Sequence, residues 1–468
     1  MPSRTSRGSR RSAVRPVDGV SSAYQIFQAT VGEPQPFFLD SGLPIGGLGR
    51  SSFVGSTPFL TLTAKGKTGR VVSADGEETF QGSPFVKLRE LLERYRMPRD
   101  TSDAPFVGGA VGYFGYDLCH HVERLPDTTI DDIRFPDLYL AFYDHAFLMD
   151  HESGQCVVAA CDANGGNPDE IVGRRLAALR DKLGSADRPA DEGGAAGAIE
   201  CNFTKEEYLR AVSRAKEYIA AGDIFQVNLS QRFHSDISCH PRRLHERLRT
   251  INPAPFAAYL EIGDCVVVSA SPERFLKVRD RHVETRPIKG TRPRRGDETR
   301  DRRMREELLA SPKDNAELAM IVDLERNDLG RVCDYGSVQV TQKCVLEEHP
   351  TVYHLVATVE GDLHEDKDLV DLLKATFPGG SITGAPKIRA MEIIDELEPT
   401  KRAVYTGAIG YIGFDGAMDL NIVIRTFLIK GRRAFFQVGG GIVADSDPES
   451  EYDETLDKAK ALMDSVRA

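Results

Sequence analysis

Short apolar segments that end at glycine, proline or aspartate recur along most of the chain. Examples lie at residues 107–115, 138–148 and 156–160, and they have the length and composition of β-strands. Beyond residue 200, similar segments mix with amphipathic helical patterns without regular alternation. Regular alternation is typical of a doubly wound parallel sheet. The pattern therefore predicts an α+β fold with large layered antiparallel-rich sheets and helices on the outside.

A glycine-rich, polar stretch (GSADRPADEGGAAG) interrupts this pattern near the middle of the chain. It reads as a linker, and we expect a first unit over residues 23–183, a linker over 184–199 and a second unit over 200–468. Residues 1–22 begin with arginines among serines and lack the apolar stretch of a secretory signal. We expect a disordered basic tail there; a transit peptide or an RNA-contacting arm is the alternative.

Composition excludes several classes of protein. The formal net charge is −11 over 468 residues, which argues against nucleic acid as the main partner. No apolar run approaches the roughly 20 residues of a membrane span. The eight cysteines form no C-x-x-C pair, so we expect reduced thiols in a cytoplasmic protein, and any metal should be held by oxygen.

Two predicted helices each carry carboxylates three residues apart. Asp314 and Glu317 form one pair, and Glu451 and Glu454 form the other. Residues at i and i+3 share a helix face. Two helices that aim their pairs at one point would make an all-oxygen site suited to Mg²⁺. The alternative is that these acids lie on solvated faces beside lysines.

Two glycine-rich clusters offer backbone N–H groups. In FPGGSITGAPK, residues 377–387, Ser381 and Thr383 add hydroxyls, and the free N–H groups at the following helix start favour an anion. The GGG triplet at residues 439–441 directly follows a strand predicted over 433–438, and glycines let a backbone approach a ligand carboxylate. Either cluster is equally compatible with a turn that binds nothing.

A lysine and a glutamate have sequence surroundings that suit catalysis. Lys289 lies among turn residues in PIKGT, beside an arginine-rich loop. Nearby cations or burial would lower its pKa and make it nucleophilic; a surface lysine is the alternative. Glu273 follows the apolar strand CVVVSAS. A carboxyl at a buried strand end has a raised pKa and serves as an acid, unless it pairs with Arg274.

Three further residues stand out near apolar strands. His354 lies between apolar residues in VYHL and is by default a hydrogen-bonded core histidine. Arg425 lies within a strand predicted over residues 419–429. A buried guanidinium needs an anion, either a protein acid or a ligand carboxylate. Tyr405 precedes the strand that leads towards Arg425.

Taken together, these segments resemble the chorismate-utilising enzymes. That family includes anthranilate synthase component I, aminodeoxychorismate synthase component I, and the isochorismate and salicylate synthases. The resemblance is strong over about residues 203–462 and looser before them, and it implies the fold of that family with a chorismate-binding catalytic domain at 200–468. The matching motifs, in order, are SPERF, PIKGTRPR, AELAMIVDLERNDLGRV, FPGGSITGAPK, YTGAIGY, IRT and GGGIVADSDPESEYDET. An earlier match, FFLDSG at 37–42, lies where some relatives bind tryptophan.

The resemblance implies Mg²⁺ as cofactor and chorismate as substrate. Glu317 and Glu454 would ligate the ion, and Glu451 and Asp314 would act through waters, although the family usually has glutamate where Asp314 stands. The groups implied to hold the ring carboxylate, with the ion, are Lys458 and the backbone of Gly439, Gly440 and Gly441.

The resemblance also implies how the rest of the substrate is held. Tyr405 and Arg425 would bind the enolpyruvyl carboxylate, and Thr383 and Ser381 would line the ring pocket. Glu273 would protonate the departing C4 hydroxyl, and His354 would orient that region.

Two positions favour one branch of the family. Water-using relatives carry a general-base lysine where this chain has Gln226, so ammonia is the favoured nucleophile. Anthranilate synthases resemble PIAGT at the segment where this chain has Lys289, and aminodeoxychorismate synthases resemble PIKGT. We therefore expect an aminodeoxychorismate synthase that forms 4-amino-4-deoxychorismate through a covalent Lys289 intermediate, for 4-aminobenzoate and folate.

The chain shows no separate glutaminase domain, so we expect a glutamine amidotransferase subunit to supply the ammonia. The main alternative is an anthranilate synthase component I that makes anthranilate for tryptophan. A non-catalytic chorismate-binding or regulatory subunit is a third interpretation, and the presence of Glu273 and Lys289 argues against it, because a binding protein needs no general acid.

Overall fold

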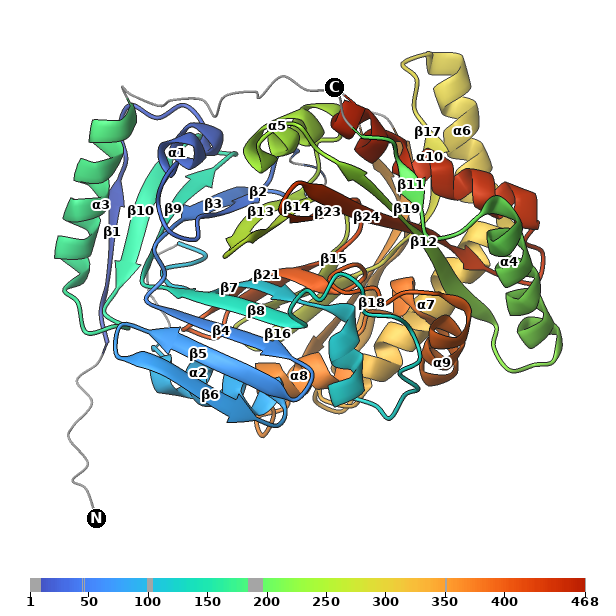
Figure 1. Cartoon of the computed structure of the whole chain (residues 1–468), viewed down its shortest axis with the longest axis horizontal. Coiled ribbons are helices and arrows are strands. Elements are labelled where there is room, and N and C mark those ends of the chain that lie inside the picture. The colour runs from blue at the N-terminus through green and yellow to red at the C-terminus, as the bar shows by residue number, and fades with distance from the viewer. Residues whose placement is uncertain are drawn as a thin grey trace.

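Two antiparallel sheets of twelve strands each form the centre of the computed structural model (Figure 1). The structure describes residues 10–43, 45, 47–98, 104–183, 197–349 and 352–467. The first sheet has the order β1-β10-β9-β3-β2-β13-β14-β23-β24-β12-β11, and β20 also pairs with β12. Its strands are β1 (Ser12–Pro16), β2 (Phe37–Asp40), β3 (Ser51–Gly55), β9 (His145–Asp150), β10 (Cys156–Cys161), β11 (Glu200–Cys201), β12 (Gln226–Asp236), β13 (Phe256–Ile262), β14 (Cys265–Ser271), β20 (Gly384–Ala385), β23 (Thr426–Lys430) and β24 (Arg433–Ile442).

The second sheet has the order β17-β19-β16-β15-β22-β21-β7-β8-β4-β5-β6, with β18 also paired to β19. Its strands are β4 (Leu60–Lys65), β5 (Thr68–Ser73), β6 (Gly76–Gln81), β7 (Gly109–Phe114), β8 (Leu138–Tyr143), β15 (Arg274–Arg279), β16 (His282–Arg286), β17 (Ile288–Pro293), β18 (Gln339–Glu348), β19 (Val352–Asp362), β21 (Ala408–Gly413) and β22 (Met418–Ile422).

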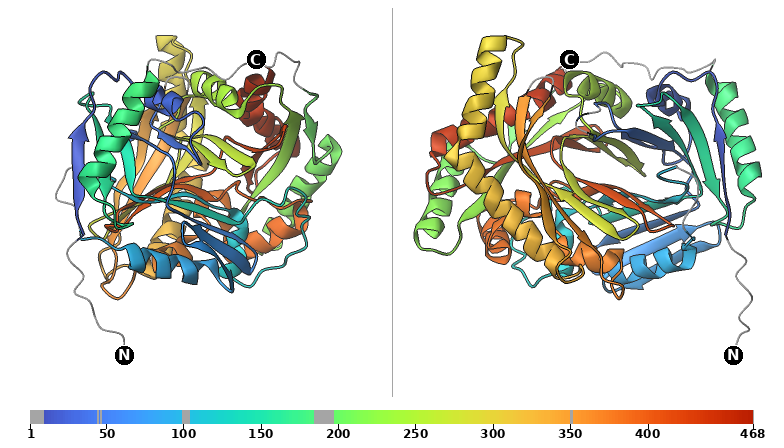
Figure 2. Two further views of the ribbon diagram at one scale, coloured as in Figure 1. Left: turned by 60° about the vertical axis from the view of Figure 1, so that its left-hand side comes forward. Right: turned by 180° about the vertical axis from the view of Figure 1, so that it is seen from behind.

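The helices cover the outer faces of the two sheets (Figure 2). One apolar core lies between the sheets and joins side chains such as Phe37 and Val267 to Tyr113 and Ile409. Further cores lie between each sheet and its helices. The helices are α1 (Ala23–Ala29), α2 (Pro84–Tyr95), α3 (Pro168–Leu183), α4 (Lys205–Ala220), α5 (Pro241–Ile251), α6 (Glu298–Ala310), α7 (Pro312–Gly330), α8 (Leu369–Thr376), α9 (Lys387–Leu397) and α10 (Pro448–Arg467), with 3₁₀ turns η1 (Tyr116–His121) and η2 (Gly380–Ile382). The predicted α+β class with layered antiparallel sheets and outer helices is confirmed.

Two segments predicted as single strands are each two strands in different sheets. Residues 138–148 divide at Asp144 into β8 of the second sheet and β9 of the first. Residues 419–429 divide at 423–425 into β22 and β23, which also lie in opposite sheets. A strand that changes sheets keeps both halves buried, so its apolar pattern continues across the corner. The sequence pattern alone therefore does not reveal the division.

The boundary expected between two units does not separate the strands of the fold. Strands from residues 10–183 and from residues 197–467 contribute to both sheets, and β13 pairs with β2 just as β21 pairs with β7. Residues 184–196 of the expected linker lie outside the described residues.

The expected disordered tail over residues 1–22 is wrong for its second half. β1 pairs antiparallel with β10, from Ser12 opposite Cys161 to Pro16 opposite Val157. Ala13 of this strand is buried in a core beside Val17, and this burial offsets the entropy lost on ordering the segment. Residues 1–9 lie outside the described residues.

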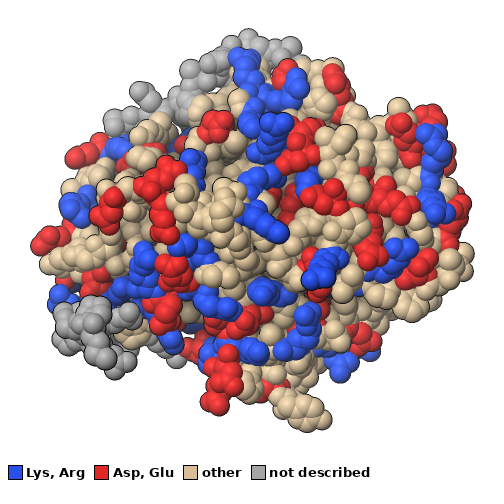
Figure 3. Space-filling view, turned by 60° about the horizontal axis from the view of Figure 1, so that its bottom comes forward, with Lys and Arg blue, Asp and Glu red and all other residues tan. Residues whose placement is uncertain are grey.

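Several bulk properties bear on the expected class of protein. Within the described residues, no helix is long and apolar enough to cross a membrane. All eight cysteines lie in the described part of the chain and are free thiols. Basic and acidic side chains are interspersed on the face that Figure 3 shows.

Candidate active site

Two of the predicted site residues lie at corners where the chain passes from one sheet to the other. Glu273 joins β14 of the first sheet to β15 of the second, and Arg425 precedes β23 after the chain leaves β22. The corners are held together by backbone bonds: the Ile422 N–H donates to the Glu273 carbonyl at 3.0 Å, and the Ala270 N–H donates to the Arg425 carbonyl at 3.1 Å. Folding of the sandwich therefore brings together residues 152 positions apart in the sequence.

Glu273 and Lys289 meet at Ser381. The Lys289 Nζ donates to the Ser381 carbonyl at 3.1 Å, from β17 at the end of the second sheet. Glu273 is buried, and its Oε1 has no hydrogen-bond partner among the described residues. Burial raises the pKa of Glu273, while a hydrogen bond from Ser381 and the Lys289 and Arg425 charges oppose that rise. Burial lowers the pKa of Lys289, against the nearby charges of Glu317 and Glu273.

These shifts favour the neutral form of both groups. A carboxyl that keeps its proton can donate it to a leaving group, and an amine without its extra proton can attack carbon. The alternative that Glu273 pairs with Arg274 is not what the structure shows, because Arg274 pairs with Asp419 and Glu284. Lys289 is half-buried and not a surface lysine.

Arg425 lies near Glu273 and Lys289, and its guanidinium group is available to a ligand. It adopts a left-handed φ of 51°, and within the described residues it forms no ion pair with a protein acid. Burial lowers its pKa, opposed by the Glu273 charge. A guanidinium desolvated in this way is suited to an anionic ligand. Tyr405 is buried in the turn before β21, and burial raises its pKa, so its hydroxyl stays protonated.

His354 lies on β19, opposite Thr291 of β17. Its Nδ1 is 3.0 Å from the Thr291 Oγ1, and its Nε2 has no partner among the described residues. Burial lowers its pKa well below the usual value, with contributions from His349 and Arg425. The ring is therefore neutral, which fits a histidine that orients groups and does not itself donate protons to solvent.

The loop that carries Ser381 and Thr383 is tied to the first sheet. The Thr383 Oγ1 donates to the Gly379 carbonyl at 2.9 Å. On the other side, the Asn228 N–H donates to the Thr383 carbonyl at 2.7 Å, and the Asn228 side chain donates to the Ile382 carbonyl at 3.0 Å. Both hydroxyl residues are buried, so the loop positions them rigidly and is not a solvent-exposed turn.

A buried ion pair beneath this loop was not found from the sequence. Arg402 and Glu398 are both almost fully buried and lie 2.6 Å apart. Arg402 also donates to the carbonyls of Ile382 and Asn228, at 3.0 and 2.6 Å. The one sequence signal was charged residues spaced i, i+4 next to an apolar strand, which is common on exposed helices. Burial of the pair makes it a structural support for the loop, because loss of either partner leaves an uncompensated charge.

The four predicted metal-binding acids come from α7 and α10, as the spacing predicted. The Oε2 of Glu451 and the Oε1 of Glu454 lie over Gly440, at 3.1 and 3.7 Å from the position that a Cβ there would take. The Glu454 charge contributes to the raised pKa values of Glu317 and Glu451, after burial in each case. Asp314 instead pairs with Arg292 at 3.0 Å.

Two lysines neutralise part of the negative charge of these glutamates. The Lys458 Nζ lies 2.7 Å from Glu454 and donates to the Gly439 carbonyl at 2.9 Å, and Lys313 lies 4.0 Å from Glu317. Across the described ranges, no three acidic, histidine or cysteine side chains converge closely enough to hold a metal. The glutamates nevertheless offer only oxygen atoms as ligands, and their negative charges repel one another. A set of side chains of this kind suits Mg²⁺.

Residues 439–441 lie within a strand, which corrects the prediction that they follow one. β24 continues through them, with Gly439, Gly440 and Gly441 opposite Ser230, Leu229 and Asn228 of β12. An added Cβ would lie 2.5 Å from the Leu229 carbonyl oxygen at Gly439, and 2.1 Å from the Gln226 Nε2 at Gly441. The glycines therefore let β12 and the Gln226 side chain approach closely.

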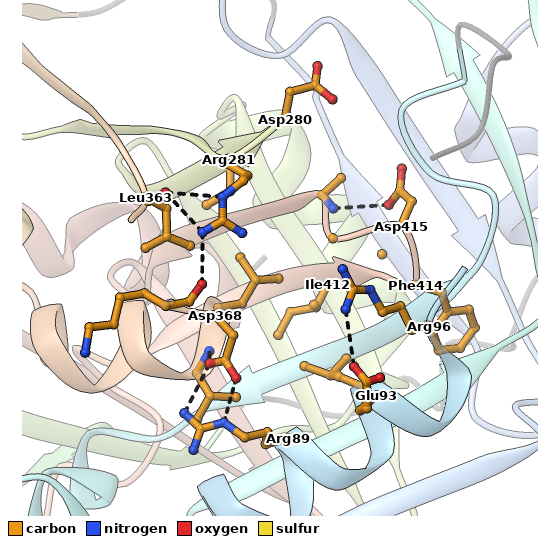
Figure 4. Close-up of a pocket in the computed structure, with 18 of the residues that line it drawn as sticks. Arg89, Glu93, Arg96, Asp280, Arg281, Leu363, Asp368, Ile412, Phe414 and Asp415 are labelled. Atoms are coloured by element: carbon orange, nitrogen blue, oxygen red, sulfur yellow. Dashed lines mark hydrogen bonds and ion pairs between the residues drawn. The ribbon is translucent and has the colours of Figure 1, made fainter. Parts of the chain in front are cut away.

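Two cavities lie away from these residues. One of about 450 Å³ is lined by apolar and charged side chains, and some of the charged ones are paired, such as Arg89 with Asp368 and Arg281 with the carbonyl of Leu363 (Figure 4). None of the predicted site residues lines it. The other, of about 370 Å³, is lined partly by the FFLDSG segment, including Asp40 and Ser41.

Comparisons with known proteins all point to the same family. The sequence model of the chorismate binding enzymes matches residues 53–464. The chain is 43% identical to "Anthranilate synthase component 1" of Thermus thermophilus, covering 92% of each chain. It is 41% identical to "Aminodeoxychorismate synthase component 1" of Escherichia coli, covering 92% of this chain and 93% of that protein. The crystal structure of anthranilate synthase component I from Streptococcus pneumoniae TIGR4 superposes with a TM-score of 0.79 at 33% identity, covering 88% of this chain and 91% of that one.

Proposed function

The chain belongs to the family of chorismate binding enzymes, and from that premise we propose that it converts chorismate and ammonia into 4-amino-4-deoxychorismate for 4-aminobenzoate and folate. The observation that carries this proposal is the meeting of Lys289 and Glu273 at Ser381, where burial favours the neutral form of each. A neutral amine beside a protonated acid is the arrangement that covalent catalysis with a hydroxyl leaving group requires.

In the first step, the Lys289 nitrogen forms a bond to C2 of the ring. Both conjugated ring double bonds shift, from C1=C2 and C5=C6 to C1=C6 and C4=C5, as the C4–O bond breaks, and Glu273 gives its proton to the hydroxyl, which leaves as water. In the second step, ammonia attacks C4, both double bonds shift back to C5=C6 and C1=C2, and the C2–N bond to Lys289 breaks. The proton that the new ammonium group loses restores Glu273, so one ammonia enters and one water leaves.

The other residues would hold the substrate during these steps. Arg425 and Tyr405 would bind the enolpyruvyl carboxylate, since Arg425 is a desolvated guanidinium without a protein acid partner in the described residues. Ser381 and Thr383 would line the ring pocket, and His354 would orient the C4 side. Binding that fixes the ring against Lys289 converts attack into an intramolecular step.

Mg²⁺ would be held by Glu317 and Glu454, with Glu451 assisting. When bound, it would supply positive charge to neutralise the ring carboxylate. In the structure Lys458 pairs with Glu454 and Lys313 lies near Glu317, so an ion held by these glutamates would compete with both lysines for the carboxylate charge. Asp314, paired with Arg292, would support the site from outside it.

The product assay tests the proposal. Purified protein with chorismate, Mg²⁺ and an ammonium salt should give 4-amino-4-deoxychorismate, identified by mass and chromatography, and a chelator should abolish its formation. If the enzyme consumes chorismate but the amine is at C2, the proposed product is wrong. No product at all, with chorismate still bound, would favour a binding subunit.

The relative of 43% identity from Thermus thermophilus favours a second candidate, an anthranilate synthase component I. Its product fluoresces without any further enzyme, whereas aminodeoxychorismate needs a lyase to give 4-aminobenzoate. The two candidates therefore differ in whether the lyase is needed before an aromatic amine appears.

A further inference from the structure

A group of buried polar side chains surrounds His354 in the second sheet. Thr291 of β17 lies opposite His354 on one side of β19, and Glu347 of β18 lies opposite it on the other; residues directly opposite one another point to the same face. His349 directly follows β18, and its ring packs in a T-shaped arrangement against the His354 ring, with centroids 4.8 Å apart. Arg286, at the end of β16, pairs with the Glu347 carboxylate. These contacts join Arg286, Glu347, His349 and His354 into one group, which is called the His354 cluster below.

Each member of the His354 cluster has a polar atom that lacks a hydrogen bond. These atoms are the Arg286 Nη1, the Glu347 Oε2 and the Nε2 of both histidines, and none finds a hydrogen-bond partner in the part of the chain that the structure describes. The four residues are only 3–7% exposed. The Glu347 Oε2 and the His349 Nε2 are 3.7 Å apart, beyond hydrogen-bonding distance. Because buried polar atoms nearly always have partners, four such atoms in one cluster indicate a site for a small polar molecule.

Glu347 and Arg286 offer that molecule an acceptor and a donor. Burial raises the pKa of Glu347, but the neighbouring His349 and Arg286 lower it overall, below its ordinary value. The free Oε2 is therefore a carboxylate oxygen, which accepts hydrogen bonds. The Arg286 Nη1 can only donate.

His354 offers a second acceptor. Burial keeps its ring neutral, so one of its two nitrogens carries a proton and the other accepts. Its hydrogen bonds, with the Thr291 hydroxyl and the backbone of Gly290, fall on Nδ1, since Nε2 has no hydrogen bond to any described residue. We assign the ring proton to Nδ1 on the basis of these bonds, which leaves Nε2 free to accept.

The proposed reaction brings ammonia to this end of the substrate. Glu273 protonates the hydroxyl that leaves C4 and is restored by the proton that the new amine loses, so ammonia reaches C4 on the Glu273 side. Arg425 lies near both residues: its charge adds to burial in lowering the pKa of His354, and it opposes the rise that burial causes in the pKa of Glu273. The same charge disfavours an ammonium cation there and does not disfavour neutral ammonia.

Neutral ammonia also matches the atoms of the His354 cluster. It carries N–H groups for the Glu347 and His354 acceptors, and a lone pair that can meet the Arg286 donor on arrival. Once the N–H groups are held, the lone pair can turn to C4. Ammonium has no lone pair for either role.

We propose that the His354 cluster binds the ammonia that attacks C4, with Glu347, His349 and the Nε2 of His354 around it. The inference rests on the proposed function, because it takes ammonia as the nucleophile and C4 as the atom attacked. It adds Glu347 and His349 as residues that act in the second step of the reaction and not in the first.

The experiment separates the two steps by withholding ammonia. Glu347→Gln and His349→Phe are each mixed with chorismate and Mg²⁺ to form the Lys289 adduct, and ammonium salt is then added over a range of concentrations. Mass spectrometry follows the formation and the loss of the adduct. We expect adduct formation within about twofold of the unmodified rate, and adduct loss at low ammonium about tenfold slower, the effect of removing one hydrogen bond to a ligand. High ammonium should restore the rate of adduct loss.

His282→Phe is the matched control. It makes the same substitution as His349→Phe in the same sheet, on β16, at a histidine whose side chain is 51% exposed. It should change neither adduct formation nor adduct loss. In steady-state assays, only the two variants of the cluster should raise KM for ammonium, and KM for chorismate should stay within about twofold.

The outcomes separate this inference from the proposed function. No 4-amino-4-deoxychorismate from the unmodified chain with ammonium salt contradicts the proposed function itself. Adduct loss at the unmodified rate in both variants overturns the ammonia site alone, and shows that the cluster holds only water. Adduct formation that slows as much as adduct loss also overturns it, because the cluster then serves only the fold.

Two further results are decided by the same criterion. If product forms without a detectable adduct, the two KM values decide, and KM values that are both unchanged or both raised overturn the ammonia site. Glu347→Gln leaves the buried Arg286 without its carboxylate partner, so if that variant does not fold, His349→Phe decides.

Discussion

Glu273 lies at a corner between the two sheets, and burial raises the pKa of its carboxyl group. One of its oxygens has no hydrogen-bond partner in the part of the chain that the structure describes. Glu273→Gln keeps the shape and removes the proton. We expect kcat to fall by about 10²–10⁴, the usual share of a general acid, while KM changes only a few-fold. Steady-state kinetics with ammonium salt measure this, and denaturant unfolding checks that the variant folds. A kcat within about twofold of the unmodified enzyme would exclude Glu273 as the acid.

His245 gives a residue-scale prediction that is independent of the active site. Its ring is packed against Phe27, Phe38 and Tyr259, and neither ring nitrogen has a hydrogen-bond partner among the described residues. Burial, with the charges of Arg249 and Arg242, lowers its pKa from 6.5 to about 3. Below pH 6.5 the unfolded chain therefore binds a proton that the folded protein does not, so stability falls as pH falls.

Between pH 7.5 and pH 5 this histidine should reduce the free energy of unfolding by about 2 kcal/mol, at 1.36 kcal/mol per unit. His245→Phe fills the same aromatic site without a titrating group and should remove that part of the pH dependence. Urea unfolding of both proteins at the two pH values measures the difference. An equal loss of stability in the two proteins would show that His245 is not buried in its neutral form.

At the scale of elements, the sequence pattern predicted the two helices that carry the acidic pairs, α7 and α10, but did not reveal the corners at which strands change sheets. The amphipathic patterns beyond residue 200 correspond to helices such as α4, whose start is marked by the capping box of Thr204 and Glu207. The helices α1, α2 and α5 were missed, although Ser22 caps α1 and proline begins both α2 and α5. The division of residues 419–429 could not be predicted, because both halves are buried.

The candidate site was predicted largely through the resemblance and only weakly through spacing. Spacing alone put Glu451 and Glu454 on one helix face but could not place them over Gly440, which depends on how α10 packs on β24. The Arg402–Glu398 pair was missed for the same reason, since nothing in a local pattern shows that a charged pair is buried. A local sequence pattern carries no information about this long-range packing.

The glycines of β24 give an element-scale prediction. Gly439→Ala would place a methyl group 2.5 Å from the Leu229 carbonyl oxygen, a backbone atom that cannot turn away. We expect a loss of about 1–3 kcal/mol of stability from this overpacking. Gly173→Ala on α3 is the control, because nothing lies within 4 Å of its Cβ and alanine should stabilise that helix by about 1 kcal/mol. Thermal unfolding of both variants measures the effects; destabilisation of similar size at both positions would contradict the close approach.

At the scale of the whole molecule, each half of the chain supplies strands to both sheets. Residues 10–183 expressed alone would leave β2, β7 and their neighbours with unpaired edges and exposed apolar faces. We therefore expect neither this fragment nor residues 197–468 to fold alone, and we expect the two to assemble when they are produced together. Circular dichroism and proteolysis measure this. A cooperative unfolding transition from either isolated fragment would show that the sheets form independently.

The whole account requires the two sheets to bring one amine of β17 to the ring of chorismate. The most direct measurement is mass spectrometry of the protein after reaction with chorismate and Mg²⁺ in the absence of ammonia. The account predicts an adduct with the mass of chorismate less one water, located on the peptide that contains Lys289, lost when ammonium is added and absent from Lys289→Ala. Undiminished 4-amino-4-deoxychorismate formation by Lys289→Ala, with no adduct on the unmodified protein, would contradict it.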